Sequence, residues 1–267
     1  MSWRRIAAVI LRQFYLMKGS LSRMLPLFAW VAIDMVLWGF ITRYLNSISA
    51  SGINFVPTFL GAVLLWDFFT RVMQGVTMTF FEDVWTRNFL NIFSTPLSVS
   101  EYVTGLVACS VASSAIGLAV MLALATLVFG LSFLTYGVML IPFLAVLLLF
   151  GIALGITACA MVLRLGPAAE WFVWPIPAVL APFAGVFYPL STLPRWMRGV
   201  GRLLPPSYVF DGMRTIVSGG HASVARLLWG GSLAVLYILV ASALFKRVHR
   251  QSMQSGLLAR YSAESAN

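Results

Sequence analysis

Long apolar runs separated by short polar segments dominate this sequence. A helix needs about 20 apolar residues to cross a bilayer, and six runs come close to that length or exceed it. They cover residues 25–44, 56–81, 103–129, 138–163, 171–187 and 224–245. The pattern therefore predicts an all-α polytopic membrane protein with six transmembrane helices, which form a single transmembrane domain over residues 1–267.

The segment before the first run, residues 1–23, is predicted to form a helix that lies in the membrane interface. Apolar residues recur every three or four positions on one face, and arginines on the opposite face can meet lipid phosphates. The apolar face contains Trp3, Ala7, Ile10, Phe14, Met17 and Leu21, and the basic face contains Arg5, Arg12 and Arg23. An unstructured basic leader is the alternative. A signal peptide is not expected, because Arg12 interrupts the apolar run too early.

Three charged residues lie inside the predicted spans. Asp34 is near the middle of the first span, and Asp67 and Arg71 stand four residues apart in the second. A charge in hydrocarbon is costly, so these side chains must face protein or water. Two interpretations remain open. Asp67 and Arg71 form a buried ion pair that Asp34 joins, or the charges bind substrate or couple protons.

A polar segment, residues 82–102, separates the second span from the third. Its first part predicts a short amphipathic helix over residues 82–93, with Trp85, Phe89, Ile92 and Phe93 on the apolar face. The following prolyl turn ends that helix, and Ser98-Val-Ser-Glu101 matches a capping box that opens the next span. An amphipathic helix within a loop either rests on the lipid surface or docks a partner.

Prolines shape the chain from the fifth span onward. Pro175, Pro177 and Pro182 lie within that span, so it must be kinked or discontinuous. Residues 188–217 are too apolar for a free aqueous loop. They predict two short helices, joined at Pro205–Pro206, that rest on one membrane face or dip into it.

The first of these short helices carries arginines at positions i, i+3 and i+7. Because the arginine fork binds phosphate well, they either anchor the helix to outer-leaflet phosphates or meet an anionic group on departing cargo. Nearby aromatic side chains favour an amphipathic substrate. The predicted substrate pathway or exit comprises Phe187, Tyr188, Arg195, Trp196, Arg198, Arg202 and Tyr208.

The net charge of +10 does not indicate nucleic-acid binding, because the basic residues flank the spans and do not cluster on one domain. With both termini in the cytoplasm, 11 of the 18 basic residues lie inside, as the positive-inside rule favours. Residues 82–102 then face the cytoplasm, and residues 188–217 face outward. Both cysteines, Cys109 and Cys159, lie within apolar runs, so no structural disulfide is expected.

Enzymatic motifs are missing from the sequence. It contains no GxxxxGK(S/T) phosphate-binding loop, no HExxH and no GxSxG, and its two histidines stand apart from other metal-ligating residues. We therefore expect no catalytic residue, metal or cofactor on this chain. Inverted repeats, which would favour a secondary transporter, are not visible either.

The segment Gly185–Arg214 closely resembles the signature region of ABC-2 type export permeases. The resemblance rests on Gly185, Tyr188-Pro189, Leu193-Pro194, Trp196, Leu204-Pro205, Tyr208 and Arg214. Thr95–Tyr102 resembles the segment that follows the family's first cytoplasmic loop helix. The number of spans, the interfacial helix and the chain length also agree, so the resemblance extends over nearly the whole chain.

The resemblance implies a permease that works as a dimer, with a second copy of the same chain as the expected partner. Each copy would bind an ABC ATPase subunit, which carries ATP and Mg²⁺, through a coupling helix at residues 82–93. Residues 188–217 would form the outer-face helices at the exit. The expected location is the cytoplasmic membrane of a bacterium, in contact with membrane lipids and with both termini cytoplasmic.

The sequence therefore predicts the transmembrane subunit of an ATP-driven exporter. Its amphipathic cargo would be a lipid, a glycolipid or polysaccharide, or a hydrophobic drug. An ion-coupled secondary transporter that uses Asp34 and Asp67 is the alternative, and a structural or assembly protein of the membrane is a third possibility.

Overall fold

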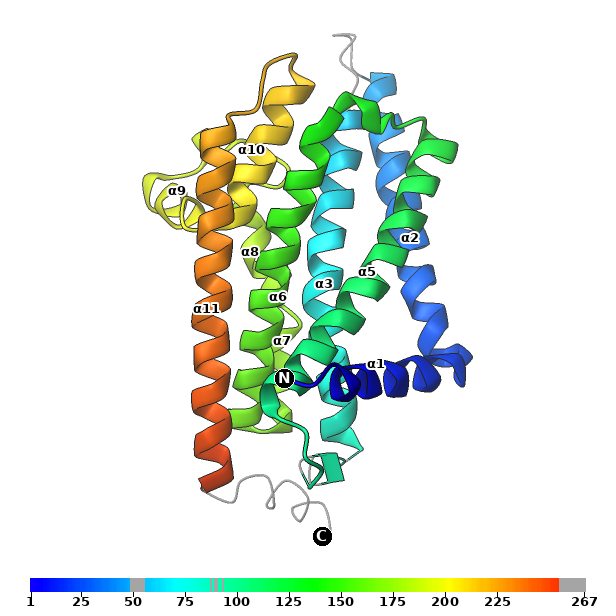
Figure 1. The fold of residues 1–267 in the computed structure, drawn as a ribbon. Coiled ribbons are helices and arrows are strands. Elements are labelled where there is room, and N and C mark those ends of the chain that lie inside the picture. The colour runs from blue at the N-terminus through cyan, green and yellow to red at the C-terminus, as the bar shows by residue number, and fades with distance from the viewer. Residues whose placement is uncertain (49–55, 87, 89–90, 93, 255–267) are drawn as a thin grey trace.

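The computed structural model describes residues 1–48, 56–86, 88, 91–92 and 94–254, which form helices and connecting segments (Figure 1). Five long helices run alongside one another. They are α2 (Leu21–Ile48), α3 (Gly61–Trp85), α5 (Val99–Phe129), α6 (Leu140–Leu165) and α11 (Val224–Gln254). The first helix, α1 (Trp3–Lys18), lies across one end of this bundle, roughly at right angles to it.

Four helical segments within the described residues are long and apolar enough to cross a membrane: Val56–Trp85, Val99–Phe129, Gly137–Leu165 and Val224–Gln254. These segments confirm four of the predicted spans. The first includes a short π-helical turn, Val56–Leu60, that leads into α3. The predicted span over residues 25–44 falls within the 28-residue helix α2.

The fifth predicted span is discontinuous, as its prolines predict. It consists of α7 (Glu170–Val173) and α8 (Ile176–Ala184), with Pro175 at the junction. Proline lacks an N–H donor, so the hydrogen-bond ladder of one helix cannot continue unbroken through this position. Gly185, at φ +64°, ends α8 in the left-handed conformation that glycine adopts without strain.

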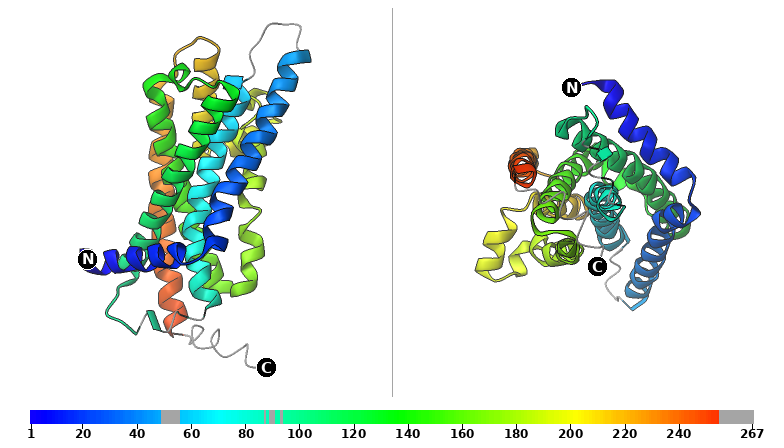
Figure 2. Two further views of the ribbon diagram at one scale, coloured as in Figure 1. Left: turned by 90° about the vertical axis from the view of Figure 1, so that its right-hand side faces the viewer. Right: turned by 90° about the horizontal axis from the view of Figure 1, so that it is seen from below.

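Helix α3 is the centre of the bundle and packs against both α5 and α6 (Figure 2, right). Small residues allow the close approach. A Cβ added to Gly155 of α6 would lie 2.8 Å from Cβ of Val76, and one added to Gly151 would lie 2.9 Å from Cβ of Val72. The small residues of this GxxxG pair thus let α6 pack closely against α3, as helices in lipid require. On its other side, α6 packs along α11.

The two ends of the bundle differ in what they carry. One end holds α1, the end of α3, the start of α5 and the end of α11 (Figures 1 and 2). The opposite end holds α9 (Arg195–Gly201) and α10 (Pro205–Val217), which are the two short helices predicted between spans five and six. The segments predicted to face inward and outward thus lie at opposite ends. We refer to them as the α1 end and the α9–α10 end.

Two helix boundaries differ from the sequence-based expectations. The helix predicted over residues 1–23 ends at Lys18, and Gly19 separates it from α2. The helix predicted over residues 82–93 is not a separate element at its start, because α3 continues through Trp85 before the chain turns at Thr86. No proline or glycine precedes that turn, so nothing in the local sequence ends α3 earlier.

Candidate functional site at the α1 end of the bundle

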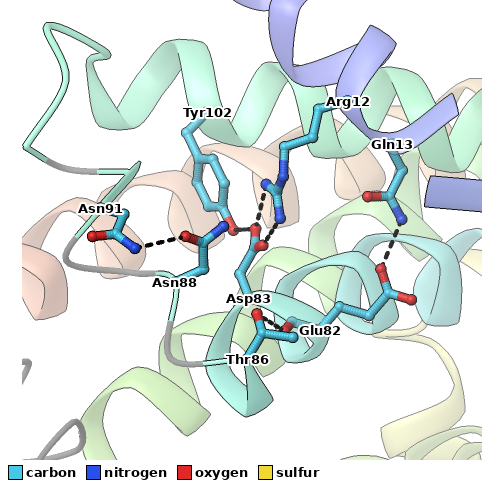
Figure 3. Close-up of polar contacts among 8 residues, drawn as sticks. All are labelled: Arg12, Gln13, Glu82, Asp83, Thr86, Asn88, Asn91 and Tyr102. Carbon is cyan, nitrogen blue, oxygen red and sulfur yellow. Dashed lines mark hydrogen bonds and ion pairs between the residues drawn. The ribbon is translucent and has the colours of Figure 1, made fainter. Parts of the chain in front are cut away.

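A buried carboxylate joins three helices at the α1 end. Asp83 of α3 is fully buried and accepts hydrogen bonds from the guanidinium of Arg12 in α1 (Figure 3). Nη1 of Arg12 lies 3.1 Å from Oδ2 of Asp83, and Nη2 bonds to Oδ1. The hydroxyl of Tyr102 in α5 donates to the same Oδ2 at 2.7 Å. The buried carboxylate is thus paired with one partly exposed guanidinium and one buried phenol.

The arrangement holds Arg12 in its charged form. Its pKa is raised, chiefly because its guanidinium donates to Asp83, and burial opposes this effect only in part. Removing one partner of a buried ion pair leaves the other charge unpaired, at a cost of about 3–5 kcal/mol. The Arg12–Asp83 pair is therefore a strong constraint on how α1 lies against α3.

A second carboxylate fixes the start of α5. Glu101 accepts the backbone N–H of Ser98 at 2.9 Å, and Oγ of Ser98 accepts the N–H of Glu101 at 3.3 Å. The predicted capping box is therefore confirmed. Glu101 also accepts the N–H of Ser2 at 2.6 Å and a bond from Arg5 at 3.4 Å. The same side chain thus caps α5 and holds the beginning of α1.

A third contact lies beside the buried pair: the amide of Gln13 donates to Glu82 at 3.0 Å. We call Arg12, Gln13, Glu82, Asp83 and Tyr102 the junction cluster. Sequence reasoning missed it, because its partners in α1 and α3 lie about 70 positions apart. Arg12 was assigned to a lipid-facing surface. The local pattern that points to the junction cluster is an acidic pair, Glu82-Asp83, at the end of an apolar span.

The segment predicted to couple to an ATPase begins directly after the junction cluster. The backbone N–H of Asn88 bonds to the carbonyl of Asp83 at 3.0 Å, and that of Ile92 bonds to the carbonyl of Asn88 at 2.9 Å. Ile92 packs partly against the core. Phe89 and Phe93, the other predicted coupling residues, lie outside the described residues. The segment therefore leaves α3 next to the junction cluster (Figure 3).

Trp85, the remaining predicted coupling residue, links α3 to the broken fifth span. Its indole N–H donates to Glu170 of α7 at 2.9 Å, and Trp174 donates to the same carboxylate at 3.2 Å. The Trp85 side chain is half exposed. It thus offers an apolar surface to the α1 end while it holds α7 in place.

At the α9–α10 end, the side chain of Arg198 bonds to backbone carbonyls of the preceding segment. Its guanidinium donates to the carbonyls of Leu190, Ser191 and Leu193 at 3.2, 2.7 and 3.1 Å. Arg195 and Arg202 are exposed and remain available to lipid or cargo. The three arginines, which share a face in the sequence pattern, therefore have different surroundings.

The aromatic residues predicted at the exit also lie near this end. Tyr188 donates to the carbonyl of Pro182 at 3.0 Å, and Tyr208 donates to that of Arg202 at 2.8 Å. Phe187 stacks on Trp38 of α2 with ring centroids 5.0 Å apart. Trp196 is largely exposed. The Phe187–Trp38 contact joins the end of the fifth span to α2, whereas Trp196 meets the ring of Phe183 edge-on and keeps most of its surface exposed.

The intramembrane charges lie between α2, α3 and α5. Arg71 contacts α5, since a Cβ added to Gly117 would lie 3.2 Å from Cδ of Arg71. Asp34 of α2 and Asp67 of α3 both interact electrostatically with Arg71. All three charged residues are partly exposed. The structure thus brings together the charges that sequence reasoning singled out.

Taken with its apolar helices, this architecture defines a multi-pass membrane protein without an ATP-binding loop of its own. A family model described as ABC-2 type transporter matches residues 5–217, most of the chain from α1 through α10. The chain therefore belongs to the ABC-2 type transporter family, as its signature residues indicate. No curated protein matches the chain. Within this family the chain is a non-catalytic membrane permease, and ABC-2 permeases work with ABC ATPase subunits.

Proposed function

We propose that this chain is the transmembrane subunit of an ATP-driven exporter in the cytoplasmic membrane of a bacterium. Its six spans would be α2, α3, α5, α6, the α7–α8 pair and α11. An even number of spans puts both termini on one side of the membrane, which the positive-inside rule favours as the cytoplasm. Two permease copies, in the simplest case identical, form the pathway. Each binds an ATPase subunit, which holds ATP and Mg²⁺, through the segment that follows Trp85. The ion-coupled alternative is set aside because the family is that of ABC transporters.

The observation that carries the proposal is the position of the junction cluster. It joins the interfacial helix α1, the last turn of α3 and the first turn of α5 at the point where the inward-facing segment leaves α3. A push on that segment by an ATPase would act on buried, fully paired charges. Separating Arg12 from Asp83 would leave a buried charge unpaired. The helices α1, α3 and α5 are therefore expected to move together.

The cargo is amphipathic and leaves at the α9–α10 end. Trp196 is exposed there, and Phe187, Tyr188 and Tyr208 lie nearby. Aromatic rings cover acyl chains or stack on sugar faces, and they suit a membrane interface. Arg195 and Arg202 anchor this end to outer-leaflet phosphates, as exposed arginines beside a membrane do.

Co-purification with a co-expressed ATPase subunit tests the proposal. The permease alone should hydrolyse no ATP, and the complex should. Trp85→Glu combined with Phe89→Glu should release the ATPase while the permease still inserts, because the contact surface loses its apolar character. Trp85→Phe is the matched control, since it keeps an apolar ring and removes only the bond to Glu170. Undiminished co-purification of the double variant would refute the proposed contact.

A further inference from the structure

We propose that Asp34, Asp67 and Arg71 form a binding site for the cationic group of an amphipathic cargo molecule. We call these three residues the charged triad. The inference rests on the proposed export function and specifies the class of cargo. The triad lies inside the apolar bundle, apart from the junction cluster and from the arginines of the α9–α10 end.

The guanidinium of Arg71 interacts electrostatically with two carboxylates that come from different helices. Arg71 extends from α3 to the face of α5, where Gly117 leaves room for it. A Cβ at position 117 would lie 3.4 Å from both Nε and Nη1 of Arg71. Asp67 stands one helical turn before Arg71 on α3, and Asp34 projects from α2. Both carboxylates interact with Arg71 and with each other.

This set of groups has spare capacity to accept a positive charge. In their ionised forms, the two carboxylates exceed the one guanidinium by one negative charge, and an uncompensated charge is unfavourable within an apolar bundle. Oδ2 of Asp67 is buried and accepts no hydrogen bond from any residue that the structure describes. A cation bound here would compensate the charge, and a cation with an N–H group would also donate to this oxygen.

A buried serine on α5 adds a second polar group without a partner. Ser114 is 1% exposed, and its hydroxyl makes no hydrogen bond within the described part of the chain. It lies on the α5 face that turns toward α3, between Ser110, which bonds to the carbonyl of Val72, and Gly117, which touches Arg71. The hydroxyl therefore lies within one helical turn of the α5 position that contacts Arg71, and a polar ligand group there would satisfy it.

The surroundings favour an organic cation over a metal ion. Hard metal ions take six or more oxygen ligands, and no group of three or more histidine, cysteine or acidic residues gathers anywhere in the described residues. Trp38 lies one turn beyond Asp34 and stacks on Phe187. Aromatic rings of this kind attract weakly hydrated organic cations. Because all three charged residues are partly exposed, such a group can reach them from outside the bundle.

Equilibrium dialysis of the permease alone, in phosphatidylcholine nanodiscs, tests the inference with tetraphenylphosphonium as probe. Tetraphenylborate is the matched control, because it has nearly the same shape and the opposite charge, and protein-free nanodiscs give the background. We expect saturable binding of tetraphenylphosphonium only. Asp67→Asn and Asp34→Asn should each weaken it about tenfold or more, as loss of a charged partner in a largely apolar site does. Asp67→Glu, which keeps the charge, should retain it.

Asp211→Asn is the control substitution, because Asp211 lies at the α9–α10 end and pairs with the exposed Arg226. It should leave binding unchanged. Equal saturable binding of both probes, no saturable binding of tetraphenylphosphonium, or unchanged affinity in both asparagine variants would overturn the inference. If one asparagine variant fails to fold, the other asparagine variant and the comparison of the two probes still test the inference. Since no ATPase is present, failure here is separate from failure of the proposed coupling.

Discussion

The guanidinium of Arg12 in α1 binds the fully buried carboxylate of Asp83 at the end of α3. This contact spans 71 positions of sequence and fixes an interfacial helix to the central helix of the bundle. Tyr102 joins α5 to the same carboxylate. The α1 end of the permease is thus organised around one buried acid, and its properties can be tested directly.

The Arg12–Asp83 pair should show strong coupling in a double-mutant cycle. Arg12→Met leaves the Asp83 charge buried and should lower the free energy of unfolding by about 3–5 kcal/mol. Adding Asp83→Asn removes that charge, so the double variant should lose less stability than the sum of the single variants. Unfolding of the detergent-solubilised permease measures each value.

The matched control for this cycle is Arg5→Met. Arg5 is half exposed, and its partner Glu101 has other donors, so its loss should cost about 1 kcal/mol or less. Additive effects of Arg12→Met and Asp83→Asn would show that the pair does not hold α1 to α3.

Glu101 should be replaceable by glutamine but not by alanine. Glutamine can complete a capping box and can still accept the N–H groups of Ser98 and Ser2. Alanine removes both bonds, and the loss of a helix cap costs about 1–2 kcal/mol. Thermal unfolding of the two variants tests this. The same loss of stability in both would mean that charge, and not capping, is the main contribution of Glu101.

Arg198→Gln should loosen the segment before α9, because three backbone carbonyls lose their donor. Amide hydrogen exchange over Leu190–Leu193 should become faster by about tenfold, the effect of roughly 1.4 kcal/mol of local stability. Arg195→Gln is the control, since Arg195 is exposed. Equal exchange in the two variants would contradict the structural role of Arg198.

Local patterns predicted much of the fold. Spans in lipid must satisfy their own backbone, so apolar runs near the required length predict helices well. The break at Pro175 and the short helices α9 and α10 followed from the chemistry of proline. The end of α3 did not, because the helix continues past the acidic pair Glu82-Asp83 to Trp85, and no proline or glycine stands between that pair and Thr86.

The site was less predictable than the fold. The capping box at Ser98 and Glu101 was visible, because its partners are three residues apart. Arg12 and Asp83 come together only through tertiary packing, so their pairing has no local signature. Arg198 looked like a surface cation, because its three carbonyl partners belong to a loop whose path the sequence pattern does not specify.

The central claim is that the segment between α3 and α5 meets an ATPase subunit. Asn91 lies in that segment and is exposed, and Val200 of α9 is exposed at the opposite end. A photo-cross-linking amino acid at each position, in cells that express the permease and its ATPase, tests the claim most directly. We predict a cross-link to the ATPase from position 91 and none from position 200. A cross-link from position 200, or none from position 91 in an assembled complex, would contradict the claim.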